Sequence, residues 1–178
     1  MYRERMEKLK EWKVSKNRKP LIIRGARQVG KTWLMKEFGK LYYEKFAYIN
    51  FDNNSRMDIL FNEEFDLDRI IQGLKIESGI NIEPENTLII FDEIQETPNA
   101  LKALKYFYEN ANEYHIVAAG SLLGVAIHQG TSFPVGKVNF MDLMPLSFFE
   151  FLDALGQEHL LNLLKNNEFD MISVFNNK

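Results

Sequence analysis

The sequence predicts an α/β fold built on a mainly parallel sheet of five strands. Short apolar runs rich in Ile, Val, Phe and Leu alternate with longer amphipathic stretches, which is the pattern of repeated strand–helix–strand units. Several of these runs are apolar at successive positions, as expected for strands covered by helices on both faces. The five predicted strands span residues 21–25, 46–52, 87–93, 114–121 and 137–143.

Helices are predicted between these strands from apolar spacing. Leu34, Phe38 and Leu41 lie at positions i, i+4 and i+7 after a glycine-rich turn, so a helix with these residues on its apolar side follows the first strand. Two more helices are predicted over residues 2–14 and 63–74.

End signals mark two further helices. Thr97 and Pro98 are typical of an N-cap followed by proline at the first helical position. Ser147 and Glu150 form a capping-box pattern, in which each side chain satisfies a backbone N–H group of the other residue. We therefore expect helices to begin at residues 98 and 148.

Composition excludes several classes of protein. Of 178 residues, 46% are apolar and 26% charged, which are averages for folded globular chains. No apolar run approaches the ~20 residues of a membrane-spanning helix, so no membrane partner is predicted. The chain has no cysteine, which excludes disulfides and thiolate sites and fits a cytoplasmic location. The three histidines, His115, His128 and His159, lack the spacing of zinc ligands.

Positive charge is concentrated at the N-terminus. Residues 1–20 carry eight basic and three acidic side chains, a net charge of +5, whereas the remainder carries −8. Such a basic arm can contact nucleic-acid phosphates. However, Glu4, Glu7 and Glu11 interleave with the bases at helical spacing, which favours an exposed helix with internal ion pairs.

The segment from Gly25 to Thr32 fits the phosphate-loop pattern G-x-x-x-x-G-K-[ST] at every fixed position. It lies between a predicted strand and a predicted helix, where loop and helix N–H groups can surround an anion. This placement disfavours an ordinary glycine-rich turn. Lys31 is predicted to reach the β- and γ-phosphates of a nucleotide, and the Thr32 hydroxyl to bind Mg²⁺. The predicted nucleotide contacts are Gly25, Ala26, Arg27, Gln28, Val29, Gly30, Lys31, Thr32 and Trp33.

A second motif is an apolar strand that ends in two carboxylates, Asp92 and Glu93. Because strand side chains alternate between faces, one carboxylate can face a metal and the other an attacking water. Asp92 is predicted to hold Mg²⁺, and Glu93 to orient or deprotonate the water. Without the phosphate loop, the pair would be interpreted as a solvated turn.

The spacing of the two motifs predicts the sheet order. About 60 residues separate the phosphate loop from the acidic pair, which leaves room for one intervening strand. This is the arrangement of three-layer P-loop NTPases with strand order 5-1-4-3-2. The fourth strand lies between the two motif strands and ends at Ser121, which is predicted to face the γ-phosphate as a catalytic sensor. The alternative role for Ser121 is that of a turn former or helix cap.

Four segments, at residues 25–32, 91–95, 120–124 and 144–152, together resemble the predicted AAA+-superfamily ATPases of bacteria and archaea. In that family an ATPase domain precedes a C-terminal domain of unknown function. The resemblance covers about residues 2–155. It implies that the nucleotide is ATP and the cofactor Mg²⁺, and that a second copy of the chain or a C-terminal effector domain is a partner.

The resemblance also implies a role for each matching residue. Lys31 and Thr32 would bind phosphate and Mg²⁺, Asp92 would bind Mg²⁺, Glu93 would be the catalytic carboxylate and Ser121 the polar sensor. Two features depart from the family pattern. Relatives commonly have Gly-Arg before the fifth strand, where this chain has Gly136 and Lys137, and lysine lacks the bidentate fork of arginine. Relatives are also about twice as long.

Three parts are expected: a basic lead-in helix and linker over 1–20, a P-loop AAA+ ATPase core over 21–155, and over 156–178 a C-terminal helix and tail that begin a further region. The predicted function is Mg²⁺-dependent hydrolysis of ATP to ADP and phosphate, which drives or regulates an attached C-terminal domain. Three alternatives stay open: a nucleotide-dependent switch with little hydrolysis, a small-molecule kinase, and a truncated remnant without catalysis.

Overall fold

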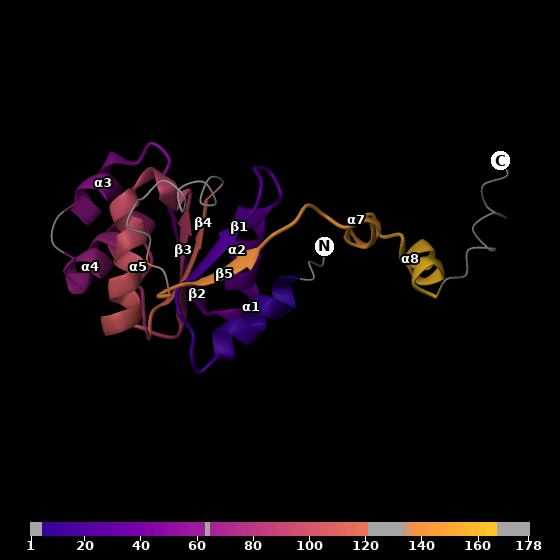
Figure 1. Cartoon of the computed structure of the whole chain (residues 1–178), viewed down its shortest axis with the longest axis horizontal. Coiled ribbons are helices and arrows are strands. Elements are labelled where there is room, and N and C mark those ends of the chain that lie inside the picture. The colour runs from indigo at the N-terminus through magenta and orange to yellow at the C-terminus, as the bar shows by residue number, and fades with distance from the viewer. Residues whose placement is uncertain (1–4, 63–64, 121–133, 135, 167–178) are drawn as a thin grey trace.

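The computed structural model describes residues 5–62, 65–120, 134 and 136–166, and contains one five-stranded sheet (Figure 1). Every neighbouring pair of strands is parallel, in the spatial order β2-β3-β4-β1-β5. Counted from the other edge this is 5-1-4-3-2, so the predicted fold class and strand order are confirmed. The strands are β1 (Leu21–Arg24), β2 (Lys45–Asn50), β3 (Thr87–Asp92), β4 (His115–Ala119) and β5 (Asn139–Asp142).

Helices cover both faces of the sheet, which gives three layers (Figure 1). One face carries α1 (Arg5–Val14) and α2 (Lys31–Tyr42), and the other carries α3 (Ser55–Asn62), α4 (Leu67–Ser78) and α5 (Pro98–Asn110). A 3₁₀ turn, η1 (Ile94–Glu96), joins β3 to α5, and α7 (Phe148–Ala154) and α8 (Glu158–Lys165) follow β5. None of the helices in the described ranges has the length and apolarity needed to span a bilayer.

Strand β3 lies inside the sheet between β2 and β4, and its position explains why its sequence is continuously apolar. Leu88 and Ile90 pack in the core between the sheet and helices α1 and α2, whereas Ile89 and Phe91 pack in the core under α3, α4 and α5. All four side chains are fully buried. Alternate residues therefore serve two separate cores, and a polar residue at any of these positions would be desolvated.

Helix α2 forms where the spacing predicted it, but one of its core residues was assigned wrongly. Leu34, Met35 and Phe38 are fully buried, whereas Leu41 is 59% exposed. The buried face of the helix is centred on Met35, Phe38 and Tyr42, so Leu41 lies at its margin in the last turn. The i, i+4, i+7 pattern identified the helix correctly and the centre of its buried face incorrectly.

The predicted helix over 63–74 is wrong in its boundaries. Asp66 is the N-cap of α4, and its carboxylate accepts hydrogen bonds from the backbone N–H groups of Asp68 (3.0 Å) and Arg69 (3.2 Å). The helix then continues to Gly79, which ends it in a left-handed conformation. These two caps, and not the apolar spacing on which the prediction relied, determine where the helix begins and ends. Helix α3 was not predicted.

The other two predicted helix starts are correct in position. Ser147 and Glu150 form the predicted capping box, with N···O distances of 3.2 and 2.9 Å. Thr97 is the N-cap residue of α5, but its hydroxyl does not cap the helix. It donates instead to Asp58 Oδ1 of α3 at 2.6 Å, which joins two helices.

The basic N-terminal segment is packed onto the sheet. Helix α1 buries Met6, Leu9 and Trp12 in the same core as α2, and Glu7 and Lys10 form a 2.6 Å ion pair on its outer side. The ion pair matches the helical spacing of acids and bases in the sequence.

Three further bases of this segment are used inside the fold. The side chain of Lys13 donates to the backbone carbonyl of Tyr42, and that of Arg18 to the carbonyl of Asn112. Lys19 Nζ donates to the carbonyl of Gly136 at 2.6 Å. Three of the eight basic side chains in residues 1–20 therefore donate to backbone carbonyls at the end of α2 and in the turns before β4 and β5.

His115 is a structural residue of β4. Its ring is buried beside Trp12 and Tyr43, and the Tyr43 hydroxyl lies 2.7 Å from its Nδ1 atom. Burial lowers the pKa of His115 to about 4, and the charges of Arg18 and Lys13 act in the same direction. In the described ranges, no three His, Asp or Glu side chains group as metal ligands, and His128 lies outside those ranges.

The contrast between Phe38 and Leu41 gives a test of the buried face of α2. Phe38→Ala should lower the free energy of unfolding by about 3–5 kcal/mol because it leaves a cavity in the core. Leu41→Ala, on the same helix, should change it by less than about 0.5 kcal/mol, as for other exposed positions. Urea denaturation measures both values, and equal losses in the two variants would contradict this assignment of the core.

Candidate nucleotide site

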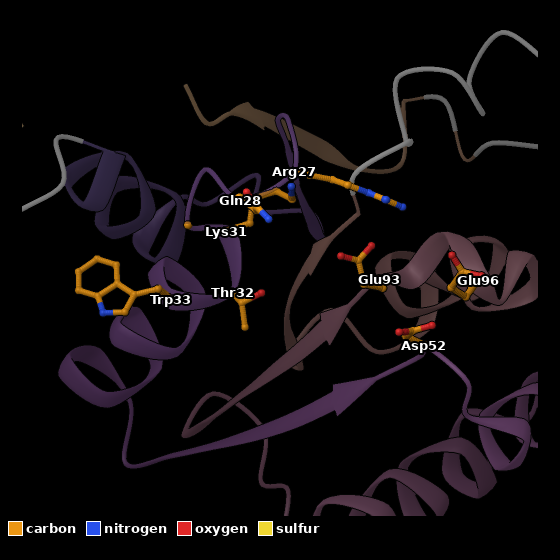
Figure 2. Close-up of a pocket in the computed structure, with 9 residues that line it drawn as sticks. Arg27, Gln28, Lys31, Thr32, Trp33, Asp52, Glu93 and Glu96 are labelled. Atoms are coloured by element: carbon orange, nitrogen blue, oxygen red, sulfur yellow. The ribbon is translucent and has the colours of Figure 1, made fainter. Parts of the chain in front are cut away.

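A cavity of about 620 Å³ opens at the carboxyl ends of the strands (Figure 2). In parallel α/β sheets this edge is the usual position of ligand sites. The loop after β1, the first turn of α2, Asp52 after β2 and the turn after β3 all contribute to it. The lining residues are Arg27, Gln28, Gly30, Lys31, Thr32, Trp33, Asp52, Glu93 and Glu96.

The loop between β1 and α2 requires glycine at its first position. A Cβ atom on Gly25 would lie 2.4 Å from the carbonyl oxygen of Leu143, which is too close for any side chain. The close approach arises because β5 continues beside the loop, where Leu143 N–H donates to Arg24 O at 2.7 Å. Farther along, Gln28 (φ 64°) and Gly30 (φ 91°) are left-handed, which turns the chain into α2.

Helix α2 begins without a side-chain cap. Its N-cap residue is Gly30, which has no side chain to satisfy the N–H groups of the first turn. Uncapped N–H groups together with the helix dipole are typical of an anion-binding helix terminus.

Lys31 lies folded over the loop. Its Nζ donates to the carbonyl oxygens of Gly25 (3.0 Å) and Ala26 (2.7 Å), and the residue is 6% exposed. Burial lowers the pKa of Lys31, while the carboxylates of Glu93 and Asp92 act against that shift. The ammonium group is thus held at the cavity wall by two neutral acceptors that an anionic ligand can replace.

Thr32 and Asp92 meet across 60 residues of sequence. The Thr32 hydroxyl donates to Asp92 Oδ2 at 2.6 Å, and Asp92 is 5% exposed. Both groups offer oxygen atoms, the donor type that Mg²⁺ prefers. This hydroxyl–carboxylate pair therefore fits the predicted Mg²⁺ ligands.

Tyr48 also supports Asp92 and was missed from the sequence. Its hydroxyl donates to Asp92 Oδ2 at 3.0 Å. Burial, together with the neighbouring Asp92 carboxylate, raises the pKa of Tyr48, so its hydroxyl stays protonated and can donate. The available signal was the predicted strand order, which places the second strand beside the acidic one.

Glu93 lines the cavity, but it does not point away from Asp92 through strand alternation as predicted. It lies past the end of β3 in a left-handed conformation (φ 53°, ψ 40°) as the first residue of the turn into η1. The carboxylates of Asp92 and Glu93 therefore diverge because the backbone turns, and strand alternation plays no part. The Glu93 side chain accepts a 2.7 Å hydrogen bond from Gln95, which sequence reasoning also missed.

Figure 2 shows Glu93 and Glu96 on the turn after β3, with Asp52 beside them in the turn after β2 and Arg27 extending over them from the loop. Asp52 and Glu96 were not predicted, because their neighbours in the sequence gave no sign of a shared cavity. The charged side chains that line the cavity are thus two cations, Lys31 and Arg27, and the three carboxylates.

The remaining predicted residues fall in different places. Gly25 and Ala26 form the loop floor that binds Lys31, whereas the Val29 side chain packs in the core beside α2. Ser121 lies outside the described residues. Lys137, which the resemblance compares with an arginine, pairs with Glu109 at 2.9 Å. It precedes β5 at the sheet edge opposite the loop, so in this chain it does not reach the cavity.

Residues 17–152 match a family model described as the AAA domain. The chain belongs to this AAA domain family. The match includes the glycine-rich loop, the acidic turn and all five strands. No curated protein sequence matches the chain.

Solved structures share the fold of this AAA domain at low sequence identity. The Walker-type ATPase PABY2304 of Pyrococcus abyssi has a TM-score of 0.56 and 18% identity, with 87% of this chain covered and 57% of that chain. Drosophila ORC bound to DNA has a TM-score of 0.57 and 17% identity, with 85% of this chain and 45% of that chain covered. The Aeropyrum pernix ORC1 protein in complex with DNA has a TM-score of 0.51 and 15% identity, with 89% of this chain and 50% of that chain covered. The chain thus spans about half the length of these proteins, and the likeness establishes the fold alone.

Gly25 offers a test of the loop geometry. Gly25→Ala should weaken nucleotide binding more than about tenfold, because the new Cβ collides with the Leu143 carbonyl and displaces the loop. Gly79→Ala is the matched control, since it strains a left-handed cap far from the cavity and should leave the affinity unchanged. Isothermal titration measures both, and unchanged binding by Gly25→Ala would contradict the loop assignment.

Proposed function

We propose that this AAA domain binds ATP with Mg²⁺ and hydrolyses it to ADP and phosphate. The observation that carries the proposal is the meeting of four groups at one cavity: the glycine loop, the Lys31 ammonium, the Thr32–Asp92 pair and the Glu93 carboxylate. Their motifs are 60 residues apart in the chain, and nothing in a purely structural role requires them to share one cavity.

Phosphate binding is proposed for the loop and the start of α2. The left-handed residues Gln28 and Gly30 bring the backbone around the cavity wall, and the uncapped helix adds its N–H groups. Lys31 would exchange its two carbonyl acceptors for phosphate oxygens, a stronger and charge-assisted interaction.

Thr32 Oγ1 and the Asp92 carboxylate would hold Mg²⁺. When bound, the ion supplies charge neutralisation at the phosphates. Asp92 is suited to this role because Tyr48 and the Glu93 backbone N–H, at 3.0 and 3.2 Å, fix the carboxylate independently of any ligand.

Hydrolysis is proposed to use Glu93 as the general base. A water molecule would donate one proton to the Glu93 carboxylate while its oxygen bonds to the γ-phosphorus, and the electron pair of the broken P–O bond would leave with ADP. A base of this kind contributes typically 10²–10⁴-fold to the rate.

A nucleotide-dependent switch with slow hydrolysis is the second candidate. Arg27 is the only arginine that lines the cavity among the described residues, and Lys137 lies at the opposite edge of the sheet. Extra positive charge for the transition state would then come from outside this domain. The discriminating measurement is phosphate release by the chain alone and with added full-length protein. A small-molecule kinase would instead transfer phosphate to an acceptor.

The macromolecular partner is proposed to be an attached C-terminal domain or a second copy of the chain. Drosophila ORC and the A. pernix ORC1 protein are described as bound to DNA. In this chain, however, Lys13, Arg18 and Lys19 donate to backbone carbonyls of their own fold. Nucleic acid is therefore the less favoured partner of the basic segment.

Two substitutions separate binding from hydrolysis. Lys31→Ala should weaken ATP binding at least about tenfold, because it removes the phosphate cation. Glu93→Gln should keep the affinity and lower kcat at least about 100-fold, because the amide cannot accept the proton. Glu109→Gln, in the last turn of α5 where it pairs with Lys137, is the matched control and should change neither. Titration calorimetry and phosphate release measure these effects, and equal turnover in Glu93→Gln and the parent would exclude the mechanism.

Trp33 gives an optical test of the nucleotide position. Its side chain is 36% exposed at the cavity, whereas Trp12, the other tryptophan, is 7% exposed in the core. Added ATP should change the emission of the parent and of Trp12→Phe, but not that of Trp33→Phe. A fluorescence titration that still responds in Trp33→Phe would show that nucleotide binds away from this cavity.

A further inference from the structure

The Gln95 amide joins two carboxylates of the cavity. Its Nε2 atom donates to Glu93 Oε2 at 2.7 Å and to Glu96 Oε1 at 3.2 Å. Both carboxylates line the nucleotide cavity. The single nitrogen therefore serves the proposed general base and its acidic neighbour at the same time.

The other end of the amide shows what determines its orientation. Gln95 Oε1 is buried and accepts no hydrogen bond from any described residue. An unmet buried acceptor costs about 1–3 kcal/mol, so native side chains normally avoid it. Turning the amide over would instead place Oε1 against the two carboxylates, which would repel it. The orientation is thus set by donation to Glu93 and Glu96.

The turn that carries Gln95 is firmly anchored. Ile94 is fully buried, and the N–H groups of Glu96 and Thr97 donate to the carbonyls of Glu93 and Ile94 at 3.1 and 3.2 Å. The Thr97 hydroxyl fastens the end of the turn to Asp58 of α3. The position of the amide is therefore set by the turn, and its hydrogen bond orients the Glu93 side chain.

We propose that Gln95 is a positioning residue for ATP hydrolysis, an inference that rests on the proposed function. By binding Glu93 Oε2, the amide selects one orientation of the carboxylate and leaves Oε1 without a partner among the described residues, free to accept the proton of the attacking water. The same amide shields Glu93 from the charge of Glu96. Orientation of this kind acts on the chemical step, and a small misplacement of a reacting group is enough to slow it strongly.

The test is steady-state hydrolysis by Gln95→Met, which keeps the length of the side chain and removes both N–H donors. We expect kcat to fall about tenfold or more, with KM for ATP and the affinity for ADP within about twofold of the parent. Asn99→Leu is the matched control, because this amide on α5 donates to Asn62 at 2.7 Å and to no other described residue. It should leave both constants unchanged.

A double variant distinguishes positioning from a general structural effect. Gln95→Met combined with Glu93→Gln should be no slower than Glu93→Gln alone, because the residue that Gln95 orients is already disabled. Gln95→Ala, which removes both donors without adding a charge, provides a second variant if Gln95→Met folds poorly, and it should show the same loss of kcat.

Unchanged kcat in a folded variant, a parallel rise of KM, or multiplicative losses in the double variant would overturn the role of Gln95. A parent that releases no phosphate from ATP would overturn the proposed function together with this inference. The two failures are thus distinguishable in one set of assays.

Discussion

The hydrogen bond from Thr32 to Asp92 is the contact on which the site depends. It joins the first turn of α2 to the end of β3, although β4 lies between β1 and β3 in the sheet. Ala119 of β4 stands in register with both Ile23 and Asp92, and its small side chain lets the helix approach the acidic strand. Because Asp92 is buried, its partners must be supplied by the fold, and Thr32, Tyr48 and the next backbone N–H supply them.

This constraint separates the tasks of two adjacent carboxylates. Asp92 belongs to the strand and is held by neutral donors, whereas Glu93 leaves the strand through a left-handed turn and enters the open cavity. The cost of that backbone conformation is offset by the anchoring of η1 through Ile94 and Thr97. The buried carboxylate proposed to bind Mg²⁺ and the carboxylate proposed as the base thus occupy neighbouring positions, with Gln95 beside the second.

The fold was predictable because its signals are local and repeated. The strand order followed from the spacing of two motifs, and Lys31, Thr32, Asp92 and Glu93 followed from the loop and the acidic pair. Features that depend on the packing of distant segments were not predictable. The exposed position of Leu41 reflects where α2 meets the sheet, and the start of α4 reflects the cap at Asp66. Tyr48 and Gln95 bind the Asp92 and Glu93 carboxylates, and Asp52 and Glu96 line the cavity, through contacts that form only in the folded chain.

The central claim, that the Thr32–Asp92 pair and the loop form a Mg·ATP site, is tested most directly by thermal unfolding with ATP in the presence and absence of Mg²⁺. A ligand at ~100 times its dissociation constant adds ~2.7 kcal/mol to stability, which raises Tm by roughly 5–10 °C in a domain of this size. The account predicts a shift of that order with Mg·ATP, a smaller one when the metal is chelated, and none in Lys31→Ala. Equal Tm values with and without Mg·ATP in the parent, at saturating concentration, would contradict it.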